Sequence, residues 1–147
     1  MIPPFNENGC LPEGIYDCTI EEAAGRFGAF QRSDRRPQLW ERFTEFMREL
    51  KLLDCVEAVL VDGSFVTVTP DPNDIDLVAV VASSYDFSTD LLPVVYNLLA
   101  PLRVRKRFGF DMVVVKNDSE NLEQSIAFFQ QVKQRPGIKK GILRIKL

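Results

Sequence analysis

The chain has 147 residues, of which 46% are apolar, and a formal net charge of −3. This length is enough for one compact domain with its own core and too short for two. Because the chain contains no histidine, Ser-His-Asp hydrolases, HExxH metalloproteases and His-ligated zinc sites are excluded, whereas chemistry based on carboxylates and magnesium remains open.

The N-terminal segment is rich in turn residues. Residues 1–18 hold three of the nine prolines together with Asn and Gly, which predicts an extended arm without a regular element, strapped across a single domain formed by residues 19–147. The segment lacks the basic and apolar regions of a signal peptide, and no apolar run approaches the roughly 18 residues that span a bilayer. We therefore expect a cytoplasmic protein with no membrane partner. The cysteines are odd in number and form no CxxC pair, so we interpret them as free thiols: Cys10, Cys18 and Cys55.

Two helices and two strands are predicted in the first half of the chain. Thr19-x-x-Glu22 is a capping-box pattern that begins a short helix, which ends near residues 25–28. A longer helix is expected over residues 34–52, where apolar residues recur at helical spacing: Leu39, Phe43, Phe46, Met47 and Leu50. Short Val-rich runs bounded by turn signals predict buried strands over residues 56–61 and 75–82.

The second half alternates helix and strand. The same signals predict a helix over residues 90–102, a strand over 110–115, a helix that begins at Asp118 or Ser119 and ends at Pro136-Gly137, and a strand over 141–147. Within the first of these helices, Pro93 belongs in the first turn and Pro101 near the end. This order predicts an α/β (α+β) sandwich with a mixed β-sheet and helices packed mainly on one face.

The stretch between the first two strands carries the candidate chemistry, since it reads VLVDGSFVTVTPDPNDIDLVAVV. Side chains alternate along a strand, so Asp74 and Asp76 would point to one side. Two carboxylates so close repel each other, and a cation such as Mg²⁺, which prefers oxygen ligands, resolves that repulsion. Gly63 allows close approach of the backbone, while Ser64 offers donors for phosphate oxygens. Together they predict a phosphate-and-metal site.

The spacing of these residues resembles a known signature. Gly63-Ser64, nine intervening residues and then Asp-x-Asp are similar to the motif of the polymerase-β-like nucleotidyltransferase superfamily, and most of all to its minimal single-domain branch. Nearly the whole chain also resembles a group of short bacterial nucleotidyltransferase-like proteins, through an opening like FNENGCLPEGIY, the GSFVT and DIDL centre and a KKGIL-type final strand. The resemblance implies a third carboxylate on a neighbouring strand, and Asp111 stands at the matching place.

The resemblance also implies an activity, a Mg²⁺- or Mn²⁺-dependent transfer of a nucleoside monophosphate from a nucleoside triphosphate to a hydroxyl of a protein or tRNA. Asp74 and Asp76 would hold both metal ions, and Asp111 the one nearest the acceptor. Gly63 and Ser64 would bind the β- and γ-phosphates. Minimal relatives imply a role in a toxin–antitoxin or phage-defence system, with a cognate partner protein or a homo-oligomer as a further expectation.

Several basic and aromatic residues are secondary candidates. A basic run could bind a triphosphate or a nucleic-acid backbone, although it could equally be a solvated connection: Arg103, Arg105, Lys106 and Arg107. No Lys or Arg lies between Gly63 and Asp74, where relatives often carry one, and four other residues could compensate: Arg35, Arg36, Lys139 and Lys140. Trp40 could stack on a base or belong to the core or an interface.

A second hypothesis, from a different class of function, remains open. The basic residue expected in the motif is missing, and the chain is too short to add the helical domain that closes over the base in larger superfamily members. These absences favour a binding or scaffold protein that keeps the fold without turnover and acts through a partner.

Overall fold

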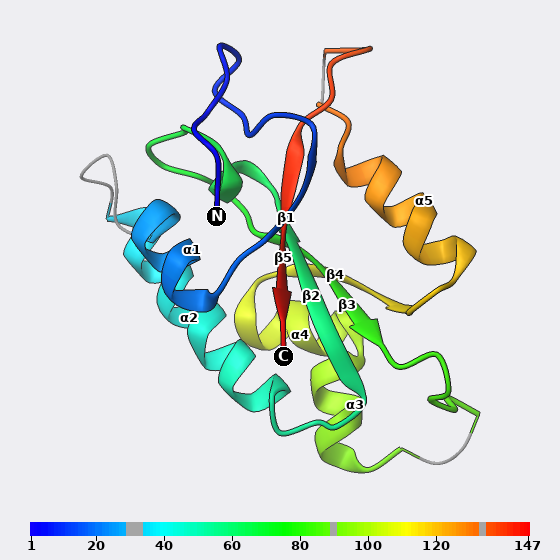
Figure 1. Ribbon diagram of the computed structural model, residues 1–147. Coiled ribbons are helices and arrows are strands. Elements are labelled where there is room, and N and C mark those ends of the chain that lie inside the picture. Colours follow the sequence, from blue (N-terminus) through cyan, green and yellow to red (C-terminus); the bar gives the residue numbers. More distant parts are fainter. Residues whose placement is uncertain (29–33, 89–90, 133–134) are drawn as a thin grey trace.

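The computed structural model describes residues 1–28, 34–88, 91–132 and 135–147 (Figure 1). Its centre is a five-stranded sheet in the order β1-β5-β2-β3-β4. The pairs β1/β5 and β3/β4 are parallel, and β5/β2 and β2/β3 are antiparallel, so the prediction of a mixed sheet is confirmed. The strands are β1 (Gly14–Asp17), β2 (Val56–Asp62), β3 (Asp76–Val81), β4 (Asp111–Lys116) and β5 (Gly141–Lys146).

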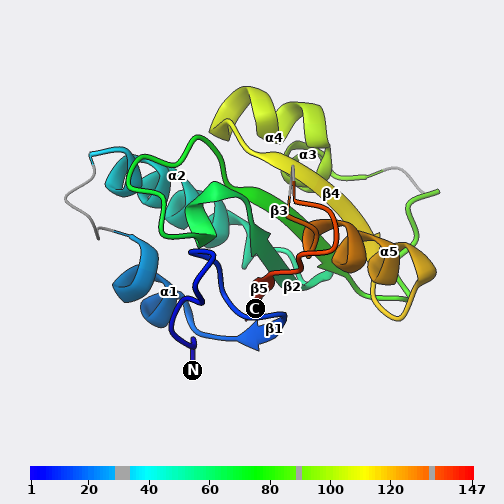
Figure 2. The same cartoon turned by 90° about the horizontal axis from the view of Figure 1, so that it is seen from above.

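The helices lie on both faces of this sheet but mainly on one. They are α1 (Ile20–Phe27), α2 (Arg35–Leu50), α3 (Pro93–Leu99), α4 (Pro101–Phe108) and α5 (Glu120–Phe129), with a 3₁₀ turn, η2, at Ser64–Val66. Side chains of α1 to α4 enter the larger core, whereas those of α5 pack against the smaller core. Helices α2 and α5 accordingly lie on opposite sides of the sheet (Figure 2). The α+β architecture with helices chiefly on one face is therefore confirmed.

The central strands are buried on both faces, which explains their uninterrupted apolar runs. In β2, Val59 and Val61 face the larger core, while Leu60 faces the smaller one. In β3, Leu77 faces the larger core and Val78 the smaller one. This alternation means that residues at the two strand ends can be assigned to a face by counting in twos.

The N-terminal arm crosses the sheet edge and contains a strand, so the prediction that residues 1–18 hold no regular element is wrong at β1. Leu11 is fully buried, and Cys10 forms an isolated bridge with Thr67. Where the arm passes β5, a Cβ on Gly141 would lie 2.3 Å from the carbonyl oxygen of Pro12. Only glycine fits at this crossing, because the two backbones approach too closely for a side chain.

Two helix predictions need correction. The helix expected over residues 90–102 is two helices, although residue 90 itself lies outside the described residues. Ala100 has extended angles (φ −89°, ψ 114°) and Pro101 begins α4, because a residue before proline disfavours the helical region. The helix expected to reach Pro136 ends at Phe129, since the returning chain takes over its backbone bonds: Lys140 N–H donates to the carbonyl of Gln130 at 2.7 Å.

The capping-box prediction is confirmed in full. The Glu22 N–H donates to Thr19 Oγ1 at 3.1 Å, and the Thr19 N–H donates to Glu22 Oε2 at 2.8 Å. Ser119 caps α5 with one bond, its Oγ accepting from the N–H of Leu122 at 3.1 Å. Among the helices in the described ranges, none combines the length and apolarity needed to cross a membrane.

Candidate functional site

A cleft of about 1260 Å³ lies where β2 ends and β3 and β4 begin, beside the segment that joins α5 to β5. It brings together Gly63, Ser64, Asp74, Asp76 and Asp111, all of which line it. The basic run of residues 103–107 does not line it. The cleft thus unites the motif residues that the sequence separates by nearly fifty positions.

Three aspartates form a row across the floor of this cleft, which we call the carboxylate row: Asp62, Asp76 and Asp111. Asp62 ends β2 and is the register partner of Asp76, which in turn is the register partner of Asp111 on β4. Register partners on neighbouring strands share a face and lie about one strand spacing, about 4.7–4.9 Å, apart. Counting in twos from Leu60 and Val78 places the row on the α5 face.

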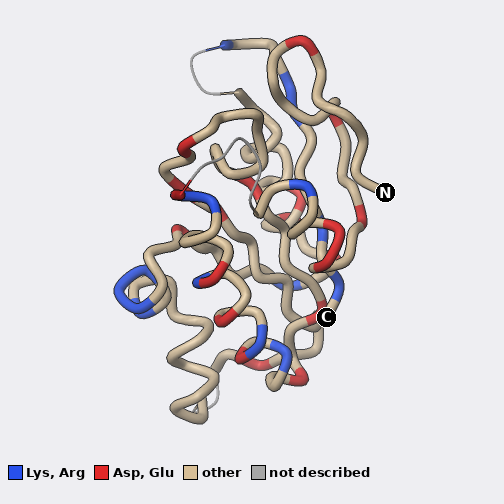
Figure 3. The backbone as a smooth tube through the Cα atoms, turned by 90° about the vertical axis from the view of Figure 1, so that its left-hand side faces the viewer, with Lys and Arg blue, Asp and Glu red and all other residues tan. Residues whose placement is uncertain are grey.

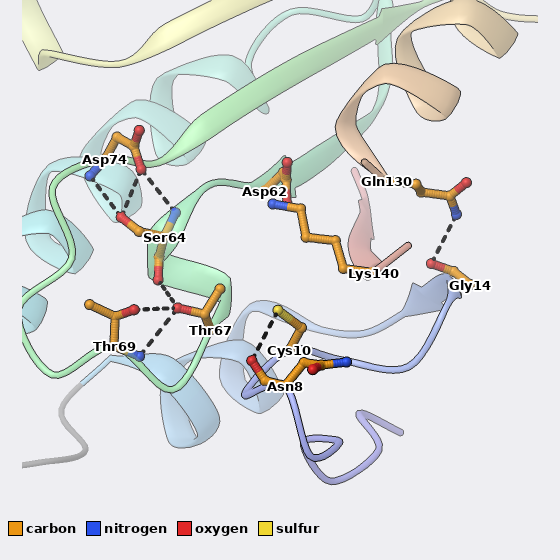
Figure 4. A network of polar contacts seen from close by, with 10 residues as sticks. All are labelled: Asn8, Cys10, Gly14, Asp62, Ser64, Thr67, Thr69, Asp74, Gln130 and Lys140. Carbon is orange, nitrogen blue, oxygen red and sulfur yellow. Dashed lines mark hydrogen bonds and ion pairs between the residues drawn. The ribbon is translucent and has the colours of Figure 1, made fainter. Parts of the chain in front are cut away.

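Basic side chains pair with both ends of the carboxylate row. Lys140 Nζ lies 3.0 Å from Asp62 Oδ1 (Figure 4), and Arg105 forms an ion pair with Asp111. Asp62 lies outside the motif and was not among the residues predicted from the sequence to form the site. Its position was a usable signal, because it directly precedes Gly63 at the end of a buried strand.

The Asp62–Lys140 pair is largely withdrawn from water, with side-chain exposures of 6% and 15%. Burial disfavours the charged carboxylate and raises the pKa of Asp62 from 3.8 to about 6. The Lys140 ammonium and the Gly63 N–H lower this pKa, but they only partly offset burial. The Asp62 carboxylate is therefore ionised at neutral pH at a cost in free energy, because its burial disfavours the negative charge.

The raised pKa of Asp62 predicts that the free energy of unfolding depends on pH. Between about pH 4 and 6 the folded protein keeps a proton on Asp62 that the unfolded chain has lost, so the free energy of unfolding falls as pH rises. Relative to Asp62→Asn, the wild type should lose up to about 3 kcal/mol across this window. Urea unfolding of both proteins in EDTA at pH 4 and pH 7 measures the difference. A gap between the two proteins that stays constant with pH would contradict the assigned burial.

Ser64 and Asp74 bind each other across the motif loop (Figure 4). The Ser64 N–H and hydroxyl both donate to Asp74 Oδ1, at 2.9 and 2.8 Å. The Ser64 oxygen also accepts from the N–H groups of Asn73 and Asp74, at 3.0 and 3.3 Å. The donors expected to bind phosphate thus orient Asp74, and phosphate binding by Ser64 would require an exchange of these bonds.

Gly63 makes the tight approach of these two segments possible. Its φ of +94° lies in the region that favours glycine, and a Cβ there would stand 3.0 Å from Asp74 Oδ1 and from the backbone N of Asp76. The glycine of the motif is therefore needed for loop closure in the protein without any ligand.

The donor set suits magnesium in chemical type, since Asp74, Asp76 and Asp111 offer only carboxylate oxygens. Within the described ranges, however, no three carboxylate, thiol or imidazole groups converge as a ready-made metal site. The reason is visible in the contacts: Asp74 uses Oδ1 for Ser64 and Asp111 turns to Arg105. Because Asp76 and Asp111 are register partners on neighbouring strands, their carboxylates can bind one metal ion between them. Binding requires that Asp111 give up its ion pair with Arg105.

The basic run lies within helix α4, so the interpretation as a connection is wrong (Figure 3). Basic residues suit the last turn of a helix because they interact favourably with its dipole. Besides Arg105 with Asp111, Arg107 pairs with Glu49 at 2.8 Å and Arg103 donates to Asn97 at 3.1 Å. The structure thus does not bring these residues to the motif glycine and serine.

Arg36 cannot supply the missing phosphate contact. It is fully buried and donates to the carbonyl groups of Phe27, Phe65, Thr67 and Thr69 at 2.6–3.2 Å. Its burial lowers the pKa of the guanidinium to about 10. Arg36 therefore holds the backbone of residues 65–69 in place. The suggestion that it replaces the missing phosphate ligand is wrong.

Arg35 and Trp40, two further secondary candidates, are structural. Arg35 donates to the carbonyl groups of Pro72 and Asn73, at 3.3 and 3.2 Å. Trp40 is half-buried and stacks on Phe65 with an interplanar angle of 11°, which favours the core alternative over base stacking. The cysteines are unbridged, as expected, and burial raises the pKa of all three thiols, Cys10, Cys18 and Cys55.

Comparison with known proteins identifies the family of this chain. The family model that matches residues 3–146 is described as a family of unknown function, DUF6932. No curated protein and no solved structure matches the chain significantly. The family description assigns no activity, so the nucleotidyltransferase resemblance stays a prediction. Since the match spans nearly the whole sequence, the chain belongs to the DUF6932 family.

Proposed function

We propose that this protein is a magnesium-dependent nucleotidyltransferase whose active site is the cleft of the carboxylate row. The observation that carries the proposal is the meeting of Asp76 and Asp111, register partners on parallel strands, with Asp74 and the Gly63-Ser64 turn in one cleft. Stability alone gives no reason to gather four aspartates there, because like charges at this spacing repel.

The aspartates of the cleft would have different roles. Asp74 and Asp76 would hold the metal ions that bind the triphosphate, with Ser64 keeping Asp74 in place through Oδ1. When bound, magnesium supplies a Lewis acid that stabilises charge on the oxygens of the phosphate chain. Asp111 would share with Asp76 the metal ion nearest the acceptor and would accept the proton of the acceptor hydroxyl. The acceptor oxygen then bonds to the α-phosphorus as the bond to pyrophosphate breaks.

The acceptor class and the biological setting rest on the resemblance. We infer a hydroxyl on a protein or a tRNA end as acceptor, and a toxin–antitoxin or phage-defence system as the setting. We further infer that a cognate partner or a second copy completes the nucleotide site.

Transfer of a labelled nucleotide tests the proposal. Purified protein is incubated with magnesium, cell lysate and each of the four ribonucleoside triphosphates, labelled in turn at the α- or the γ-phosphate. Label from the α-position should enter protein or tRNA, and label from the γ-position should not. Absence of α-label, or α-labelling that persists in Asp74→Ala/Asp76→Ala, would overturn the assignment.

A scaffold function is the second candidate, favoured by one observation: intramolecular partners already engage Asp62, Asp74 and Asp111. A scaffold should show no magnesium-dependent nucleotide binding in calorimetry, and its cellular activity should tolerate neutral replacement of these residues. Loss of that activity in Asp74→Asn, with partner binding intact, would rule the scaffold out.

A further inference from the structure

The cleft draws its positive charge from one segment that the motif does not include. Among the residues that the structure describes, the basic side chains lining the cleft are Arg135, Lys139 and Lys140, all in the connection between α5 and β5. The motif loop itself contributes none, because no Lys or Arg lies between Gly63 and Asp74. A triphosphate carries several negative charges, so any phosphate contact in the cleft falls first on this connection.

Lys140 differs from its two neighbours in burial. Its side chain is 15% exposed, against 60% for Lys139, and Arg135 is exposed as well. Lys139 pairs outside the motif, 3.6 Å from Glu13, and Arg135 donates to Asn8 at 3.4 Å. Water and salt screen a buried charge less than an exposed one, so Lys140 offers the strongest electrostatic contact of the three.

The backbone fixes where Lys140 stands. Its N–H donates to the carbonyl of Gln130 at the end of α5, at 2.7 Å, and the next N–H, of Gly141, donates to the carbonyl of Leu11 at 2.9 Å. The N-terminal arm crosses at Gly141 so closely that no side chain fits. Two chain segments therefore hold the start of β5 and direct Lys140 toward the end of β2.

The Asp62–Lys140 pair is a poor device for stability. A buried ion pair loses hydration on both partners, and well-packed apolar residues of similar size are often equally or more stable. The pair also stands one strand from Asp76, at the start of the motif turn. The desolvation cost of the pair and its position beside the motif together indicate that the Lys140 ammonium has a role in binding a ligand.

We propose that Lys140 binds the phosphate chain of the nucleotide, replacing the basic residue missing from the motif loop, and that Asp62 holds its ammonium in position until the nucleotide arrives. The inference rests on the proposed nucleotidyltransferase function and adds to it the residue that recognises the phosphates. The phosphate oxygens take over the ammonium, so Asp62 is its partner only in the absence of the nucleotide and competes with the phosphate chain for it, and the carboxylates nearer Asp111 remain for the metal.

Calorimetry with magnesium tripolyphosphate, which has a phosphate chain and no base, tests the inference without turnover. Lys140→Met should weaken binding about 10- to 100-fold, the range for one charge-assisted contact. Lys139→Met is the matched control, since it removes an adjacent lysine of the same cleft, and it should change binding less than about threefold, as expected of an exposed charge.

Two further variants separate binding from folding. Asp62→Asn leaves the ammonium in the cleft and removes its competitor, so tripolyphosphate should bind as tightly as in the wild type or more tightly. Asp62→Asn/Lys140→Met leaves no unpaired buried charge, so it should fold and still bind as weakly as Lys140→Met. A purely structural ion pair would leave the tripolyphosphate affinity of Lys140→Met and of the double variant equal to that of the wild type.

The outcomes also separate the two proposals. If wild type binds magnesium tripolyphosphate and Lys140→Met binds it equally well, the role of Lys140 is wrong while the proposed function survives. If wild type does not bind it and its melting temperature does not respond to magnesium, both fail. Weak binding confined to Lys140→Met and the double variant, with the magnesium response retained, supports both.

Discussion

Replacing Arg36 with methionine should lower the free energy of unfolding by about 3–5 kcal/mol, the upper range for single substitutions. The guanidinium donates five hydrogen bonds to the carbonyl groups of Phe27, Phe65, Thr67 and Thr69. Each buried carbonyl left without a partner costs about 1–3 kcal/mol, although these costs are not additive. The methionine stem would fill part of the volume but satisfy none of the carbonyl groups.

Arg35→Met is the matched control, because the neighbouring arginine also donates to two backbone carbonyl groups but near the surface. It should cost less than about 1 kcal/mol. Urea unfolding followed by circular dichroism gives both values. Arg36→Lys should recover little, since an ammonium cannot reproduce the planar fork. Equal losses for Arg35→Met and Arg36→Met would show that the buried network does not hold the loop after the motif.

Replacing Asp76 with asparagine should reduce nucleotide transfer by about 10³-fold or more, since metal ions supply several kcal/mol of transition-state stabilisation and each 1.36 kcal/mol is tenfold in rate. Asp76 stands in the middle of the carboxylate row, with Asp62 and Asp111 on the neighbouring strands. Asparagine keeps its shape but removes the charge that binds the metal. The initial rate of α-label transfer, at saturating magnesium and nucleotide, measures the effect.

Asp54→Asn serves as the control, because this exposed aspartate precedes β2 at the end away from the cleft. Its transfer rate should match that of the wild type. The metal-free Asp76→Asn protein should be as stable as the wild type or more stable, because removing one of several close charges relieves repulsion. A transfer rate that Asp76→Asn leaves unchanged would exclude the carboxylate row as the active site.

The sequence predicts most of the fold because local signals and core periodicity agree. The capping box at Thr19, the apolar stripe of α2 and the Val-rich strands each combine a boundary signal with a burial pattern. The sequence pattern failed at Pro101, where a proline expected near a helix end begins the next helix. Local pattern also missed β1, whose strand state depends on pairing with β5, a partner more than 120 residues away.

In the candidate site, too, the features set by local sequence could be predicted and those set by distant chain segments could not. The motif spacing places Gly63, Ser64, Asp74, Asp76 and Asp111 in one cleft, because the two strand ends and a short loop bring them together. The pairing of Lys140 with Asp62 could not be predicted, since it depends on where the sheet seats β5 beside β2. Nothing in the spacing distinguishes the buried Arg36 from its half-buried neighbour Arg35, since both begin the same helix.

The response of the melting temperature to magnesium tests the metal site most directly, because it needs no knowledge of the substrate. A cation that binds only the folded state stabilises it by about 3 kcal/mol at a hundredfold excess over its Kd, which raises the melting temperature of a chain of this size by roughly 5–11 °C. Magnesium or manganese should produce such a rise in the wild type, and Asp76→Asn should remove most of it. A wild-type melting curve that neither cation moves would contradict the metal site, and with it the proposed activity.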